Sequence, residues 1–128
     1  MQDVQKLYQN LGKLFYAVAA SDKVVREEEK KTLKNIVKED WLKVDDFKDE
    51  YGSDAAFHIE IIFDWLDENQ PPAFNAFDDF KNFKKEHEEL FTPAIKKLIW
   101  KTADQIASSF SGKNKSELIM LSQLKAIL

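Results

Sequence analysis

Apolar residues recur at steps of three and four along most of the chain, which is the period of an amphipathic α-helix. The pattern predicts helices over residues 3–20, 26–40, 54–69, 73–91, 93–110 and 115–128, with a short helix or turn near 44–51. No segment alternates with the period of a strand, and the chain holds only three glycines and three prolines. The sequence therefore predicts an all-α fold.

Two of these helices have distinctive apolar patterns. Helices 54–69 and 93–110 are expected at the centre of the fold, the former because its segment "FHIEIIFDWL" is apolar nearly all round. In 73–91, phenylalanines fall every three residues, so their stripe drifts by about 60° at each step. Such a stripe contacts several neighbours or exposes an aromatic edge. The candidate partner surface there consists of Phe74, Phe77 and Phe80 with Asp78 and Asp79.

Length and composition are those of one globular domain, residues 1–128. The chain has no cysteine, which excludes disulfides, zinc–thiolate sites and cysteine nucleophiles. No apolar run reaches the roughly 18 residues of a membrane span. The amphipathic start does not resemble a cleaved leader, so we expect a cytoplasmic setting.

Charge is divided unevenly along the chain. Residues 39–80 carry 13 acidic side chains against two lysines, giving −11, while the whole chain has a net charge of −4. Solvated helix faces explain such a segment, and the alternative is a docking surface for a cationic partner or for metal ions. Lysines elsewhere are mixed with glutamates without interleaved aromatic residues, which argues against nucleic-acid binding.

The stretch "YAVAASDKVVREEEKKTL", residues 16–33, holds the main candidate site. Asp22, Val25 and Glu29 have the spacing of positions five, eight and twelve of an EF-hand loop. Val18 and Ala20 cannot supply the first and third ligands, so a complete EF-hand is excluded. The alternatives are a two-carboxylate metal corner or a structural corner with glutamates at the positive end of a helix.

The end of the chain repeats this corner. Laying "AASDKVVREEEKKTLKNI" on "ASSFSGKNKSELIMLSQL" without a gap places Glu117 on Glu29. Asn114 falls on Arg26, and Asn114 with Glu117 has the spacing of a capping box. The sequence thus predicts two helical hairpins, each with a glutamate near the start of its second helix.

This pair of corners resembles the TerB-like family, named for a bacterial tellurite-resistance determinant. Residues 17–37, "AVAASDKVVREEEKKTLKNIV", carry most of the resemblance, and residues 107–128 match more weakly. The resemblance implies an all-α domain with a duplicated hairpin and a role in bacterial stress responses, near membranes or multiprotein complexes. It also implies an acidic site for a divalent ion (Ca²⁺, Mg²⁺ or Mn²⁺) where the corners meet, with Asp22, Glu29 and Glu117 as candidate ligands.

Three positions depart from the family pattern. Lys23 stands where the family has glycine, Arg26 where it has a capping serine, and Phe110 where the second corner would have its aspartate. Calcium prefers six to eight oxygen ligands, more than this corner offers. We therefore expect a weak or vacant site in which Asp22 mainly accepts backbone hydrogen bonds, and in which Lys23 can neutralise the carboxylates.

The resulting function hypothesis is a non-enzymatic TerB-like domain that acts through contacts with a protein partner and binds a divalent ion weakly. One alternative is a metal-dependent enzyme that uses Glu60 and Asp64, four residues apart on one helix face, with Asp22 or Glu29. Another is a plain helical adaptor that uses the acidic and aromatic surface.

Overall fold

The computed structural model describes residues 2–44, 52–109 and 112–128, omitting the side chains of residues 2, 3 and 52–54, and this part of the chain is all-helical. Its six α-helices are α1 (Gln2–Ala19), α2 (Glu27–Glu39), α3 (His58–Asn69), α4 (Ala73–Glu86), α5 (Pro93–Ser108) and α6 (Lys115–Ile127). Three short 3₁₀ helices are η1 (Trp41–Lys43), η2 (Gly52–Phe57) and η3 (Glu88–Leu90). The all-α prediction is confirmed.

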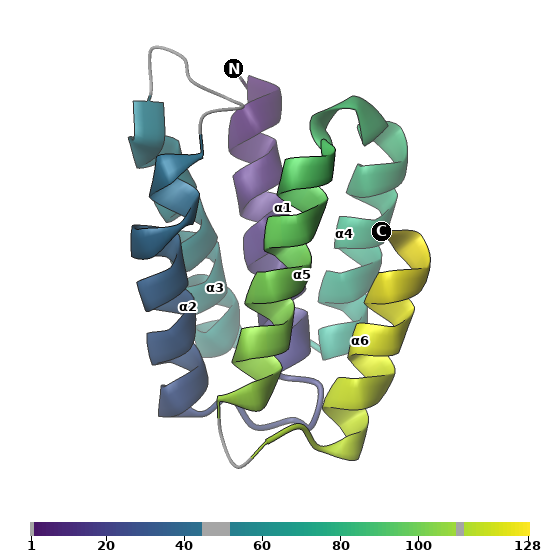
Figure 1. Ribbon diagram of the computed structural model, residues 1–128. Helices are drawn as coiled ribbons and strands as arrows, with labels where there is room; N and C mark the ends of the chain where they lie inside the picture. Colours follow the sequence, from purple (N-terminus) through teal and green to yellow (C-terminus); the bar gives the residue numbers. More distant parts are fainter. Residues whose placement is uncertain (1, 45–51, 110–111) are drawn as a thin grey trace.

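Helix α1 lies at the centre of the structure, with α2 and α3 on one side and α4 and α6 on the other (Figure 1). It packs most extensively against α3 and α4 and also contacts α5 and α6. Leu7, Leu11, Leu14 and Phe15 are fully buried on it. Gly12 permits the close approach of α3, because a Cβ there would lie 2.7 Å from the carbonyl oxygen of Ile59.

Helix α2 makes its main contacts with α5, α3 and η1 rather than with α1, to which its corner joins it. Directly after α2, Trp41 of η1 forms a buried hydrogen bond, in which its Nε1 donates to Thr102 Oγ1 of α5 at 3.0 Å. The first corner therefore connects two helices that are not each other's principal packing partners.

The expected central position of helix 54–69 is wrong. Helix α3 buries Ile59, Phe63 and Leu66 against its neighbours, but Ile61 and Trp65 are 58 % and 59 % exposed. A sequence that is apolar all round does not distinguish a helix with neighbours on every side from one with an apolar outer face. The latter arrangement holds here, and α1 occupies the centre instead.

The expected aromatic surface on α4 is wrong for two of its three phenylalanines. Phe77 and Phe80 are buried, and only Phe74, at 65 %, is largely exposed. The drifting stripe instead lets α4 contact several elements, since Phe80 packs edge-on against Phe91 beyond η3. Asp78 and Asp79 are exposed, and Asp79 forms an ion pair with Lys13 at 3.4 Å.

The start of α5 follows its predicted capping residue. Thr92 Oγ1 accepts the Ile95 N–H, with Pro93 in the first helical position. Other boundaries differ, since α3 begins at His58 instead of 54 and α4 ends at Glu86 instead of 91. Helix α3 ends at Asn69, and its C-cap residue Gln70 has a φ of 52°, in the left-handed region just before two prolines.

Over the described residues, no helix has the length and apolar character needed to traverse a bilayer.

Candidate functional site

The two corners meet at one end of the helical bundle, between the starts of α2 and α6 (Figure 1). Asp22, in the first corner, and Asn114, in the second, are 92 residues apart in sequence. The Asn114 side-chain amide donates to Asp22 Oδ2 at 2.6 Å. The two corners that repeat in the sequence therefore contact each other in the structure. We call this region the corner junction, and it consists of Asp22, Arg26, Glu29, Asn114 and Glu117.

Asp22 is the centre of the hydrogen bonding at the junction. Its Oδ1 accepts the Val24 backbone N–H at 3.1 Å, and its Oδ2 accepts from the Arg26 guanidinium at 2.8 Å as well as from Asn114. Burial raises the pKa of Asp22, but the hydrogen bonds from Arg26, Val24 and Asn114 and the guanidinium charge lower the pKa more, and the net shift is downward. The expectation that Asp22 accepts a backbone bond in the loop is confirmed.

A glutamate at the third position of each helix reaches back to its own N-cap residue. Glu29 Oε1 accepts the Arg26 backbone N–H at 2.7 Å, and Glu117 Oε1 accepts the Asn114 backbone N–H at 3.0 Å. At the second corner Asn114 Oδ1 also accepts the Glu117 N–H at 2.9 Å, which completes the predicted capping box. Both glutamates are buried, at 0 % and 2 % exposed.

Glu29 and Glu117 form a buried carboxyl pair. Burial is the largest cause that raises the pKa of Glu29, and the neighbouring Glu117 carboxylate raises it further, to about 8. Among the described residues, Glu29 Oε2 is a buried oxygen without a hydrogen-bond partner. Two carboxylates can share a hydrogen bond only when one is protonated, so a proton on Glu29 Oε2 would supply the missing bond to Glu117.

The three candidate ligands are not arranged to hold an ion. Over the part of the chain that the structure describes, no group of three histidine, cysteine, aspartate or glutamate side chains has a metal-binding arrangement. Both Asp22 oxygens are engaged by protein donors, and the Arg26 guanidinium already supplies a positive charge at 2.8 Å. The residues of the corner junction therefore do not fit a divalent ion in this conformation.

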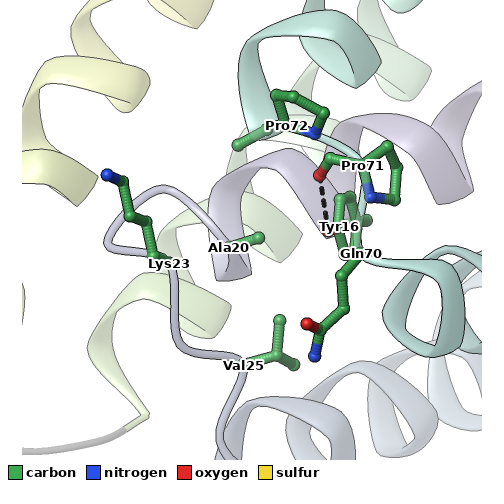
Figure 2. Close-up of a pocket in the computed structure, with 8 residues that line it drawn as sticks. Tyr16, Ala20, Lys23, Val25, Gln70, Pro71 and Pro72 are labelled. Atoms are coloured by element: carbon green, nitrogen blue, oxygen red, sulfur yellow. Dashed lines mark hydrogen bonds between the residues drawn. The ribbon is translucent and has the colours of Figure 1, made fainter.

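Lys23 adopts a backbone conformation that is uncommon for a residue with a side chain. Its backbone φ is 71°, in the left-handed region that favours glycine, and its side chain points away from Tyr16 and Pro71 (Figure 2). The cation that neutralises Asp22 is Arg26. Phe110, expected at the aspartate position of the second corner, lies outside the described residues.

A pocket of about 450 Å³ opens beside the first corner (Figure 2). It is lined mainly by apolar side chains from α1, the corner and the α3–α4 connection, with Lys23 and Gln70 as its polar members. Tyr16 spans part of it, because its hydroxyl donates to the Pro71 carbonyl at 2.8 Å. Among the described lining residues there is no carboxylate or histidine, and the titratable side chains are Tyr16 and Lys23.

The alternative carboxylates lie elsewhere. Asp64 is 3.8 Å from Lys34 on the α2 side of α3, and both side chains are half exposed. Lys34 follows Glu29 by five residues, which places it about 7.5 Å further along α2 and about 140° around its axis. Burial, followed by the Asp64 charge, raises the pKa of Glu60 despite Lys34. Glu60 and Asp64 therefore share a surface with each other but do not converge with Asp22 and Glu29.

Arg26 is the residue of the corner junction whose contact with Asp22 sequence reasoning missed. From the sequence it is the counterpart of Asn114 and a replacement for a capping serine, whereas in the structure its guanidinium also pairs with Asp22, four residues earlier.

A scan against models of known protein families, and searches of curated proteins and of solved structures, found no match to this chain.

Proposed function

We propose that this chain is a non-enzymatic TerB-like helical domain that acts through protein contacts in a bacterial stress response of the tellurite-resistance type. The observation that carries the proposal is the corner junction, where two helices, each with a glutamate that accepts the backbone N–H of its N-cap residue, are tied together by Asp22 and Asn114. That arrangement is what a duplicated hairpin with paired acidic corners requires.

In this proposal the corner junction is a structural lock with at most weak divalent-ion binding. Asp22, Glu29 and Glu117 are the residues that would contact an ion, and Arg26 competes for Asp22 with its own charge. The left-handed backbone at Lys23 supports the resemblance, because glycine is the residue that the family places there.

A non-enzymatic role is supported by the positions of the carboxylates. The enzyme alternative needs Glu60 and Asp64 to act with Asp22 or Glu29 in one concave site. Glu60 and Asp64 lie near Lys34, whereas Asp22 bonds to the second corner. A metal-dependent hydrolytic centre assembled from these four residues is therefore disfavoured.

Calorimetric titration with Ca²⁺, Mg²⁺, Mn²⁺ and Zn²⁺ tests the proposal, using the chelator-treated chain and its Asp22→Ala, Glu29→Ala and Arg26→Ser variants. We expect no binding tighter than millimolar in the unmodified chain. Arg26→Ser should bind at least tenfold more tightly because the competing cation is gone. Low-micromolar binding by the unmodified chain that both carboxylate substitutions abolish would replace the structural lock with a dedicated metal site.

A further inference from the structure

The outer face of α3 carries two parallel ridges of different chemistry. Phe57, the last residue of η2, and Ile61 and Trp65 of α3 are spaced by four residues and are 40 %, 58 % and 59 % exposed. Residues spaced by four lie along one inclined row on a helix surface, so these three side chains form an apolar ridge. The ridge spans about 12 Å along the helix axis.

The second ridge is acidic and lies directly beside the first. Glu60, Asp64 and Glu68 repeat the same spacing of four, each one position before or three positions after a member of the apolar ridge. Asp64 and Glu68 are exposed and Glu60 is partly exposed. The groove between two such rows is the feature into which a row of side chains from another helix packs.

The acidic ridge is only partly neutralised by its own chain. Lys34 approaches Asp64 at 3.8 Å, a distance at the limit of an ion pair between half-exposed side chains. Within the described residues, Glu60 and Glu68 form no ion pair. Burial is the largest cause that raises the pKa of Glu60, and the Lys34 charge lowers this pKa by more than the Asp64 charge raises it, so Lys34 partly neutralises both carboxylates.

We propose that the outer face of α3 is a docking surface for a basic amphipathic helix of a partner protein. The proposal rests on the proposed action through protein contacts and names the chemistry of the partner. The partner helix would place an apolar row on Ile61 and Trp65 and its lysines or arginines against Glu60, Asp64 and Glu68. Two rows of spacing four pack at a crossing angle of about −50°.

Charge decides between this occupant and the alternatives. A second copy docked through the same face would bring its own three carboxylates against Glu60, Asp64 and Glu68, which like-charge repulsion disfavours. An anionic lipid surface is disfavoured for the same reason. Solitary exposed apolar residues are common on proteins, but here an aromatic and an aliphatic side chain continue one row beside a charged row.

The test uses the full chain and a synthetic 18-residue helical peptide with leucines at a spacing of four flanked by lysines. The same peptide with glutamates in place of the lysines is the charge control. Isothermal calorimetry gives the affinity, and ¹⁵N chemical-shift mapping gives the location. We expect the lysine peptide to bind with shifts confined to α3 and the facing side of α2, and the affinity to fall as salt is added.

Two variants and one matched control locate the surface. Trp65→Ala should weaken binding at least about tenfold, since aromatic anchors dominate such contacts. Asp64→Asn combined with Glu68→Gln should weaken it by about three- to tenfold and flatten the salt dependence. Phe74→Ala, which removes an exposed aromatic ring on α4, should leave the affinity within twofold.

Several results would overturn the proposal. These are equal binding of both peptides, no binding of the lysine peptide, or sedimentation that shows self-association lost on Trp65→Ala. Binding that is lost in Phe74→Ala but kept in Trp65→Ala would reject the α3 surface and leave action through protein contacts standing. The proposed function fails separately, through the metal titration at the corner junction, which does not involve α3.

Discussion

The two corners of this fold each place a glutamate at the third position of a helix, but they cap that helix differently. Asn114 supplies both halves of its capping box, because its side-chain oxygen accepts the Glu117 N–H and its backbone N–H donates back to Glu117. Arg26 has only donors in its side chain and cannot accept the Glu29 N–H, which bonds to the Arg26 carbonyl at 3.0 Å instead. Asp22, four residues earlier, accepts hydrogen bonds from the Arg26 guanidinium and the Val24 N–H.

Helix α2 therefore starts without a side-chain cap, and its corner is held by other bonds. Asp22 holds the guanidinium, the Val24 N–H and the opposite corner together. The first corner therefore depends on the Arg26–Asp22 ion pair and on the bond to the second corner, while the second corner caps its helix with the side chain of its own Asn114. The two corners should accordingly respond differently to substitution.

The largest expected effect concerns pH and Glu29. Folding raises the pKa of Glu29 to about 8, so the folded state binds a proton that the unfolded state releases above its ordinary carboxyl range. Stability should therefore be greatest at the acidic end of the range from about pH 5 to pH 8 and should fall as pH rises across it. The loss is on the order of 1.36 kcal/mol for each unit by which folding raises the pKa.

Urea unfolding at several pH values checks this effect. Glu29→Gln should flatten the pH dependence, because the amide can donate to Glu117 at every pH as the protonated acid does. Glu27→Gln at an exposed position on the same helix is the control and should retain the wild-type slope. A stability that rises from pH 6 to pH 8 in the unmodified chain would contradict a shared proton.

Asp22→Ala should have the next largest effect. It removes the acceptor for two side chains and one backbone N–H, and it should cost about 2 kcal/mol because one of these hydrogen bonds is to a charged group. Thermal and urea unfolding measure the loss. A cost below about 0.5 kcal/mol would show that the corners do not depend on Asp22 for their connection.

Asn114→Ala should cost about 1 kcal/mol, the usual value of an N-cap side chain, with a further loss from the broken bond to Asp22. Arg26→Ala should be less destabilising than Asp22→Ala, since Asn114 and Val24 still bond to the remaining carboxylate. A double-mutant cycle between Asp22 and Asn114 isolates their coupling, and additive losses would refute a direct link.

The smallest expected effect is a gain. Lys23→Gly should stabilise the chain by about 1 kcal/mol, since glycine adopts the φ of 71° without the cost of a Cβ. Val24→Gly, next in sequence and outside the positive-φ region, should destabilise it instead. Equal effects from the two substitutions would show that backbone strain at Lys23 is negligible.

Sequence patterns predicted the helices of this fold because their apolar period and caps act locally. Thr92 with Pro93, and Asn114 with Glu117, each specified a helix start that the structure contains. The position of α3 was not predictable from local pattern, because Ile61 and Trp65 are apolar yet exposed. Which apolar face stays uncovered depends on the other helices.

The corner junction was predictable in part. That Glu29 and Glu117 approach each other was what the resemblance to the TerB-like family implied, and both are buried at the junction. The ion pair from Arg26 to Asp22 depends on the turn through Lys23, which the sequence indicated only through the family position of a glycine. Whether Arg26 and Asn114 both reach the Asp22 carboxylate depends on the tertiary structure and not on the local sequence.

The central place of α1 has a consequence for synthesis of the chain. It leaves the ribosome before α3, α4, α5 and α6, yet these later segments supply the surfaces that bury Leu7, Leu11 and Leu14. Synthesis adds about 5–20 residues per second, so α1 waits several seconds for its last partners. During that interval its apolar side chains are open to chaperones and to neighbouring nascent chains.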